Sequence, residues 1–234
     1  MKIVGLQKLT LLDYPGNVAC TVFLDGCNFR CPFCHNSQLL DSSAPEVISL
    51  QQLLDFLRLR KGILDGVCIT GGEPTLHPDL PQLLRAIKEM GYKIKLDTNG
   101  YRPDVLQQIA GEGLADYVAM DVKNGPEAYG LTVGLKAIDI QRIEQSIRYL
   151  AEGTVDYELR CTVVEPLHDQ TTMEDMARWL QMLAGGKIKR MYLQSFVDRD
   201  TVPVAGLFAP TAEQMGQYCQ TLRFCAKKTE VRGI

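Results

Sequence analysis

Three cysteines, Cys27, Cys31 and Cys34, lie in the stretch DGCNFRCPFCHNSQ (residues 25–38) with the spacing C-x3-C-x2-C. Thiolates select zinc or iron–sulfur clusters. A structural zinc site needs four protein ligands, and no fourth cysteine follows nearby, because the next one along the chain is Cys68. A cubane held by three thiolates keeps one iron open to an outside ligand, and an open position is the mark of a reacting metal. The spacing therefore predicts a reactive iron–sulfur cluster.

The alternative is structural zinc in a non-catalytic interaction module. His35 adjoins Cys34 directly, and consecutive residues rarely both reach one tetrahedral ion. His77 or Cys68 could supply the fourth ligand from another part of the chain. The polar composition of the loop argues against cysteines that are merely buried. Anaerobic reconstitution separates these possibilities, because only an iron–sulfur protein becomes brown.

The elements that must position this loop alternate along the chain. Short β-branched or apolar runs predict strands at residues 18–24, 67–70, 93–98, 117–120, 157–164 and 190–194. Helical periodicity predicts helices at residues 50–60, 79–90, 103–111, 139–152, 171–183 and 211–226. Six β/α units predict a parallel sheet with right-handed crossovers. We expect an α/β fold, a partial (β/α)6 TIM-like barrel, with an open Rossmann-like sheet as the second possibility.

We expect one domain over residues 1–234, with an N-terminal extension at about 1–17 and the six units at about 18–226. In barrels of this type, chemistry sits at the carboxyl ends of the strands. The cysteine loop follows the first predicted strand. The later strands end in TGGEPT (70–75), DTNG (97–100), MDVK (120–123), EP (165–166) and LQSF (193–196), and Arg160 lies within the fifth. These motifs are predicted to meet on one rim.

The rim motifs suggest specific contacts. Glycines in GGEP let a backbone approach a ligand closely, and Glu73 can accept a hydrogen bond from an ammonium group. Asp97 and Asp121, at adjacent strand ends, would repel each other unless a cation lies between them or Lys123 pairs with them. Arg160, inside a strand, needs a partner.

The cysteine spacing, with Phe33 before the last cysteine, resembles the signature of the radical S-adenosylmethionine (SAM) enzymes. This resemblance implies a 4Fe-4S cluster whose open iron chelates the amino and carboxylate groups of SAM. An electron from the cluster then breaks a C–S bond, giving methionine and a 5′-deoxyadenosyl radical that abstracts a hydrogen atom. GGE at residues 71–73 matches a second motif of the family.

The motifs GLQKLTLLDYPG, CNFRCPFCHN, TGGEPTLHPDL, KLDTNGY, MDVK, RCTVVEPLHD and LQSF together look most like the single-cluster activating proteins of anaerobic ribonucleoside-triphosphate reductase. The resemblance implies that the radical removes a hydrogen from one glycine of a partner glycyl radical enzyme, with flavodoxin or ferredoxin as the reductant. Two alternatives stay open. One is an activating enzyme of the pyruvate formate-lyase kind, and the other is a radical SAM enzyme acting on a small molecule, such as a deazaguanine-forming synthase.

By the same resemblance, the cluster and cofactor carry the chemistry, and no side chain is expected to be catalytic. Asp97, Thr98, Met120 and Asp121 are implied ligands of a monovalent cation. Phe196 stands where formate-lyase activating enzymes have a histidine, and Gln194 is a possible substitute. The implied SAM-binding residues are Phe33, Asn36, Gly71, Gly72, Glu73, Pro74, Asp97, Asn99, Asp121, Lys123, Arg160 and Gln194.

Composition excludes several other classes. A net charge of −3 without a long Lys/Arg block argues against a nucleic-acid partner. The longest apolar runs are too short to span a membrane, and the first 16 residues lack the apolar segment of an export signal. A disulfide scaffold is usually short and secreted, and this chain of 234 residues with eight cysteines is neither. We therefore expect the cytoplasm, where clustered cysteines are more often metal ligands or redox groups.

Overall fold

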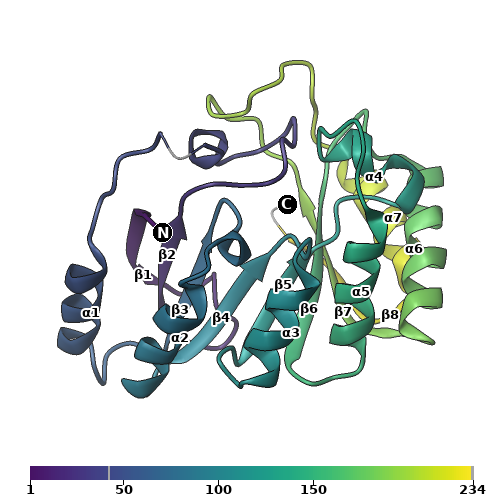
Figure 1. Ribbon diagram of the computed structural model, residues 1–234. Coiled ribbons are helices and arrows are strands. Elements are labelled where there is room, and N and C mark those ends of the chain that lie inside the picture. Colours follow the sequence, from purple (N-terminus) through teal and green to yellow (C-terminus); the bar gives the residue numbers. More distant parts are fainter. Residues whose placement is uncertain (42, 233–234) are drawn as a thin grey trace. The chain divides into compact units, whose positions relative to one another are not determined.

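A computed structural model describes residues 1–41 and 43–232. Eight strands form one open sheet in which they follow one another in chain order (Figure 1). Strand β1 pairs antiparallel with β2, whereas β2–β3, β3–β4, β6–β7 and β7–β8 are parallel pairs. The strands are β1 (Ile3–Thr10), β2 (Ala19–Leu24), β3 (Gly66–Gly71), β4 (Lys93–Thr98), β5 (Tyr117–Asp121), β6 (Asp156–Val163), β7 (Ile188–Ser195) and β8 (Ala226–Arg232).

Helices connect the parallel strands, as the crossover geometry requires. They are α1 (Leu50–Leu59), α2 (Leu80–Glu89), α3 (Pro103–Gly111), α4 (Pro126–Thr132), α5 (Ile140–Ala151), α6 (Gln170–Ala184) and α7 (Ala212–Leu222), with 3-10 turns η1 (Ser37–Leu39) and η2 (Pro74–Leu76). Capping boxes begin α1 at Ser49, α6 at Asp169 and α7 at Thr211. Among the described residues, no helix combines the length and the apolar character needed to cross a lipid bilayer.

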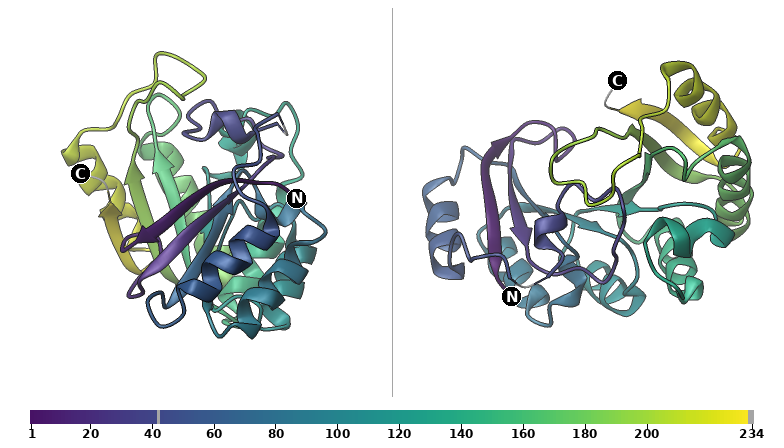
Figure 2. Two further views of the ribbon diagram at one scale, coloured as in Figure 1. Left: turned by 90° about the vertical axis from the view of Figure 1, so that its left-hand side faces the viewer. Right: turned by 90° about the horizontal axis from the view of Figure 1, so that it is seen from above.

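The predicted α/β class, with an open sheet of the partial-barrel type, is confirmed. Two strands were not predicted. The expected N-terminal extension contains β1, which lies beside β2 (Figure 2). The helix predicted at 211–226 ends at Leu222, and the chain then forms β8, which pairs with β7. Cys225, which we expected on that helix, lies in the turn before β8.

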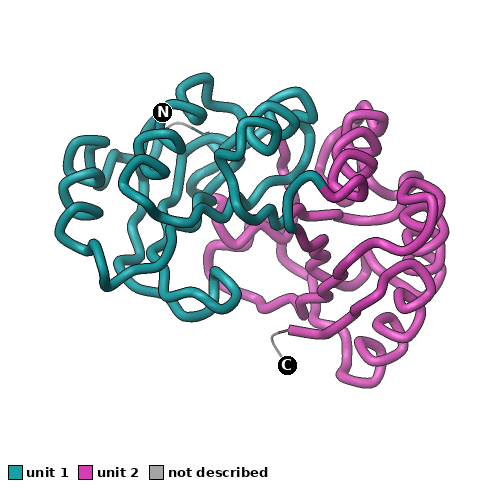
Figure 3. The backbone as a smooth tube through the Cα atoms, turned by 90° about the horizontal axis from the view of Figure 1, so that it is seen from below, with its two compact units in different colours: residues 1–28, 38–119, 154–156 teal, residues 29–37, 120–153, 157–234 magenta. Residues whose placement is uncertain are grey.

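The backbone groups into two compact units, which are described one at a time below (Figure 3). Unit 1 contains residues 1–28, 38–119 and 154–156, and unit 2 contains residues 29–37, 120–153 and 157–234. The division does not follow chain order, and it separates Cys27 from Cys31 and Cys34. A single domain stays a prediction.

Each unit has its own apolar core between helices and strands. In unit 1, α2 turns Leu80, Leu84 and Ile87 inward, and all three are fully buried. In unit 2, α6 packs against α5, α7 and β7, and it buries Met173 and Met176.

Candidate functional site

The carboxylate of Glu73 organises the rim of unit 1. Glu73 follows β3 at the start of η2, and it is only 1% exposed. Its Oε1 accepts hydrogen bonds from the Thr75 amide (3.1 Å), the Thr75 hydroxyl (2.5 Å) and the Thr98 hydroxyl (2.7 Å). Its Oε2 accepts the Asn99 amide at 2.6 Å. Burial raises the pKa of the Glu73 carboxyl, while these hydrogen bonds act in the opposite direction.

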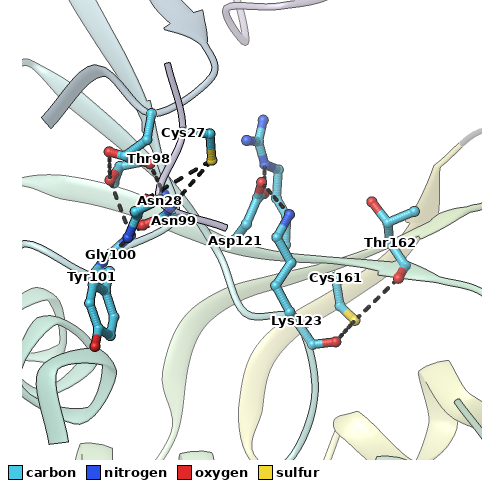
Figure 4. A network of polar contacts seen from close by, with 12 residues as sticks. Cys27, Asn28, Thr98, Asn99, Gly100, Tyr101, Asp121, Lys123, Cys161 and Thr162 are labelled. Carbon is cyan, nitrogen blue, oxygen red and sulfur yellow. Dashed lines mark hydrogen bonds and ion pairs between the residues drawn. The ribbon is translucent and has the colours of Figure 1, made fainter. Parts of the chain in front are cut away.

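This network fixes the DTNG turn beside Cys27 (Figure 4). The Asn99 side chain donates from Nδ2 to Oδ1 of Asn28 at 2.8 Å, and the same nitrogen lies 4.0 Å from Cys27 Sγ. Its Oδ1 accepts the Tyr101 amide at 3.0 Å. Asn99 is therefore held by both ends of its amide, with a donor directed at the first cysteine. Within unit 1, the structure brings together Cys27, Glu73, Thr98 and Asn99.

The two glycines of GGEP are required by close backbone packing. Gly71 has a φ of +124°, and a Cβ there would collide with the backbone of Leu24. A Cβ at Gly72 would overlap the carbonyl oxygen of Gly26. The Glu73 amide donates to that same carbonyl at 2.7 Å. The glycines thus let the β3 turn lie directly against the start of the cysteine loop, and Pro74 is buried next to them.

Unit 2 holds Cys31 and Cys34 in a tight turn, in which the Cys34 amide donates to the Cys31 carbonyl at 3.1 Å. Burial raises the pKa of the Cys31 thiol to about 11, and it also raises the pKa of Cys34. The ring of Phe33 is buried, and Lys123 Nζ lies 5.9 Å from its centroid. Asn36, two residues after Cys34, is half-buried.

Asp121 at the end of β5 forms the centre of a charged triad in unit 2. Its Oδ1 accepts from Arg160 Nε at 2.9 Å, and its Oδ2 accepts from Lys123 Nζ at 2.9 Å. Burial alone would raise the pKa of Asp121, but the two cations outweigh it and hold that pKa at about 2. The same ion pairing raises the pKa of Lys123 against the effect of burial. The predicted need of Arg160 for a partner is confirmed.

The structure also shows the surroundings of Gln194 and Phe196, the two residues considered in place of the histidine. The Gln194 side chain is exposed on β7. Phe196, just beyond β7, stacks on His35 of the cysteine loop with ring centroids 5.7 Å apart. His35 Nε2 also lies 2.7 Å from the Val197 carbonyl. The position at which a histidine was expected therefore supports the cysteine loop through an aromatic stack, and Gln194 as a SAM contact stays a prediction.

The two carboxylates among the predicted cation ligands pair with cationic side chains of the chain itself. In unit 1, Asp97 forms an ion pair with Lys95, and the Thr98 hydroxyl is bound to Glu73. In unit 2, Met120 is fully buried and Asp121 is paired as above. These carboxylates are already matched by positive charge, which does not fit the monovalent cation that the resemblance implies.

The donor set of the cysteine loop does fit an iron–sulfur cluster. All eight cysteines lie in the described residues and none forms a disulfide, and Cys27 and Cys34 are partly exposed. Within the part of the chain that the structure describes, no three His, Cys, Asp or Glu side chains converge as they would on a single metal ion. In a cubane, each thiolate binds a different iron, so the sulfurs need not converge on one point. Three thiols that form no disulfide suit such a cluster.

A glycine after α4 supports the cysteine loop in unit 2. The Arg30 amide donates to the Val133 carbonyl at 2.9 Å. Gly134 follows with a φ of +70°, and a Cβ there would overlap the carbonyl oxygen of Arg30. Sequence analysis overlooked this contact, because it joins segments about a hundred residues apart.

We expect Gly134→Ala to lower the free energy of unfolding by about 3 kcal/mol or more, because overpacking adds to the strain of a positive φ. The matched control is Gly153→Ala, since Gly153 has a φ of +82° and a Cβ added there would meet no atom within 4 Å. Its loss should be about 1–2 kcal/mol. Urea unfolding measures both variants, and equal losses would contradict the contact.

Comparison with known proteins decides the family. The family model of the radical SAM superfamily matches residues 21–183. The chain belongs to the radical SAM superfamily. Membership implies a 4Fe-4S cluster and SAM. The expectation of a radical SAM enzyme is thereby confirmed, whereas the roles of individual side chains stay predictions.

Several relatives of this radical SAM chain narrow the comparison. A "Putative glycyl-radical enzyme activating enzyme" of Methanocaldococcus jannaschii is 33% identical over 183 residues, which are 75% of this chain and 74% of the relative. A pyruvate formate-lyase-activating enzyme of Clostridium pasteurianum is 31% identical over 169 residues (66% and 70%). A 7-carboxy-7-deazaguanine synthase of Thermococcus kodakarensis is 27% identical over 180 residues (68% and 68%).

A solved structure agrees with the fold. A domain of the pyruvate-formate lyase-activating enzyme of Bacteroides vulgatus aligns with a TM-score of 0.59 and 22% identity, over 72% of this chain and 99% of the domain. At this identity the match shows the fold alone. It supports the partial-barrel class of the radical SAM enzymes.

Proposed function

We propose that this radical SAM enzyme activates a glycyl radical enzyme by removing one hydrogen atom from a glycine of that partner, and that the partner is anaerobic ribonucleoside-triphosphate reductase. The observation that carries the proposal is the 33% identity to the M. jannaschii activating enzyme across three quarters of both chains. The motif order along the whole chain supports the reductase as the partner.

The bound cofactors would supply one electron and the carbon radical that accepts the glycine hydrogen. The protein's own part is to hold and orient. We propose that Cys27, Cys31 and Cys34 hold the cluster, and that Asn99, held at both ends of its side chain, orients the cofactor next to Cys27. Lys123, fixed by Asp121, offers a cation that can bind the cofactor's carboxylate.

We further propose that flavodoxin or ferredoxin supplies the electron and that the reaction takes place in the cytoplasm. The eight cysteines, none of which forms a disulfide in the described structure, support a reducing compartment. Glycyl radical formation can be tested before the natural electron donor is known, because dithionite can reduce the protein in its place.

The test is electron paramagnetic resonance of the reconstituted, reduced protein mixed with SAM and anaerobic ribonucleotide reductase. We expect a carbon-centred doublet from the glycyl radical, which is absent without SAM and absent when the reductase carries Ala in place of its radical glycine. A doublet with pyruvate formate-lyase but not with the reductase would contradict the proposed partner and show that the protein activates pyruvate formate-lyase instead.

The second candidate is a deazaguanine-forming enzyme, which the similarity to the T. kodakarensis synthase favours. A host strain that makes this protein would then accumulate 7-carboxy-7-deazaguanine, measurable by mass spectrometry. Accumulation of that product, together with no glycyl radical on either partner enzyme, would replace the proposed function by this one.

A further inference from the structure

Lys95 is a buried lysine on strand β4 of unit 1. Its side chain is 2% exposed, and its ammonium forms an ion pair with the carboxylate of Asp97. The same nitrogen lies 3.7 Å from Cys68 Sγ. Lysine is almost never fully buried unless it is paired, because an unpaired buried charge is strongly unfavourable. The ion pair with Asp97 explains how the chain tolerates Lys95 there.

The strand fixes this ammonium in place. Lys95 and Asp97 are two residues apart on β4, so their side chains lie on the same face of the sheet. Ile94 and Leu96 point to the other face and are fully buried. Lys95 is paired in register with Cys68 of β3. Its position is therefore set by two hydrogen-bonded strands and not by a mobile loop.

The Lys95–Asp97 pair also belongs to the candidate site. Asp97 is followed by Thr98 and Asn99, the two residues that Glu73 holds by hydrogen bonds. The Asp97 side chain is 14% exposed, whereas the Lys95 side chain lies beneath it at 2%. The lysine thus neutralises the carboxylate from the more deeply buried position of the two.

From this geometry we propose that the Lys95 ammonium takes the place of the monovalent cation at Asp97, so that SAM binding by this chain requires neither Na⁺ nor K⁺. An ammonium carries the same single charge as these ions, and it donates hydrogen bonds to a carboxylate. It is tethered to the chain, so its occupancy does not depend on salt.

The second predicted carboxylate ligand, which lies in unit 2, is also paired with side-chain cations of the protein. Asp121, the other carboxylate implied as a cation ligand, has both oxygens bound by Lys123 and Arg160 at 2.9 Å. Each unit therefore neutralises its own carboxylate with side chains. Lys95 is a positioning residue, since its described contacts are with Asp97 and Cys68. The inference depends on the SAM cofactor of the family and is independent of which partner is activated.

The first test uses the unaltered protein. The affinity of the reconstituted, unreduced protein for SAM is measured by equilibrium dialysis in NaCl, in KCl and in tetramethylammonium chloride at equal ionic strength. We expect the three dissociation constants to agree within about twofold, because no metal cation is needed at Asp97. An affinity lower by about tenfold or more in tetramethylammonium chloride would overturn the inference, since it would show a bound metal cation.

The second test removes the ammonium by Lys95→Met, because methionine is an unbranched, uncharged side chain only one atom shorter than lysine. We expect SAM affinity to fall by about tenfold or more in tetramethylammonium chloride, and Na⁺ or K⁺ to restore it by binding Asp97. The matched control is Lys93→Met on the same strand, because Lys93 is exposed and bonds to Asn17. It should behave as the unaltered protein does.

Two results of the second test would overturn the inference. One is an unchanged SAM affinity of Lys95→Met in tetramethylammonium chloride, and the other is a loss that no cation repairs, which would assign Lys95 a packing role only. Iron content and circular dichroism verify that the variant is folded and loaded. If Lys95→Met does not fold, the SAM affinities of the unaltered protein in the three salts still show whether SAM binding needs a metal cation.

Discussion

Cys31→Ala is expected to abolish SAM cleavage and to leave the reconstituted protein without a stable 4Fe-4S cluster. Cys31 supplies one of three thiols in the loop, and two thiolates cannot hold a cubane that normally takes at least three. The fold should survive, with a loss of about 1 kcal/mol in the free energy of unfolding, because a small side chain becomes slightly smaller. Cys27→Ala and Cys34→Ala should give the same result.

The matched control is Cys219→Ala in α7, because Cys219 and Cys31 are both 8% exposed. Cys219 lies on a helix that carries none of the predicted cluster ligands. Iron and sulfide analysis, the visible absorbance of the cluster, and 5′-deoxyadenosine measured by chromatography are the three readouts. A normal cluster in Cys31→Ala, or loss of the cluster in Cys219→Ala, would show that the cluster ligands have been misassigned.

The sequence allowed the central elements to be predicted because their pattern is strong. Residues 93–97 alternate polar and apolar side chains, and the predicted strand, 93–98, has the same bounds as β4. The edge strand β8 was not predicted, because its pattern is weak. Strand β8, AKKTEVR, carries charges on its exposed positions and has no apolar run. The strand was therefore not recognised, and the predicted helix was extended to its first residue, Ala226. Pairing with β7 gives this segment its strand structure.

The candidate site was predicted in its residue types but not in its pairings. Asp97 and Asp121 were recognised as carboxylates that need a positive charge, and Lys123 was considered as the partner of both. The structure confirms Lys123 for Asp121 and assigns Lys95 to Asp97. A lysine between two buried apolar residues, followed two positions later by an aspartate, is a signal that would have revealed the pair.

Contacts across long sequence separations could not be predicted from the chain. Glu73 lies 26 residues from Asn99, and nothing in GGEP indicates that its carboxylate is bound by the DTNG turn. We had expected Glu73 to accept from the cofactor's ammonium group. That contact stays a prediction, but the structure shows that Glu73 already accepts four hydrogen bonds from its own chain.

Glu73→Gln is therefore expected to lower the free energy of unfolding by about 3 kcal/mol, although the two side chains have nearly the same shape. Each carboxylate oxygen accepts a backbone N–H, that of Thr75 on Oε1 and that of Asn99 on Oε2. A glutamine has only one oxygen, so either orientation turns its NH₂ group toward one of these donors. A buried unsatisfied donor costs about 1–3 kcal/mol, and the lost hydrogen bonds to a charge add to it.

The control is Glu89→Gln at the end of α2, because Glu89 is exposed and the change removes the same charge. It should alter the free energy of unfolding by no more than about 0.5 kcal/mol. Urea unfolding of both apoproteins measures the difference without any cofactor. Equal, small effects in the two variants would mean that the Glu73 network does not hold the DTNG turn, and Asn99 would then lose the support that aims its amide at Cys27.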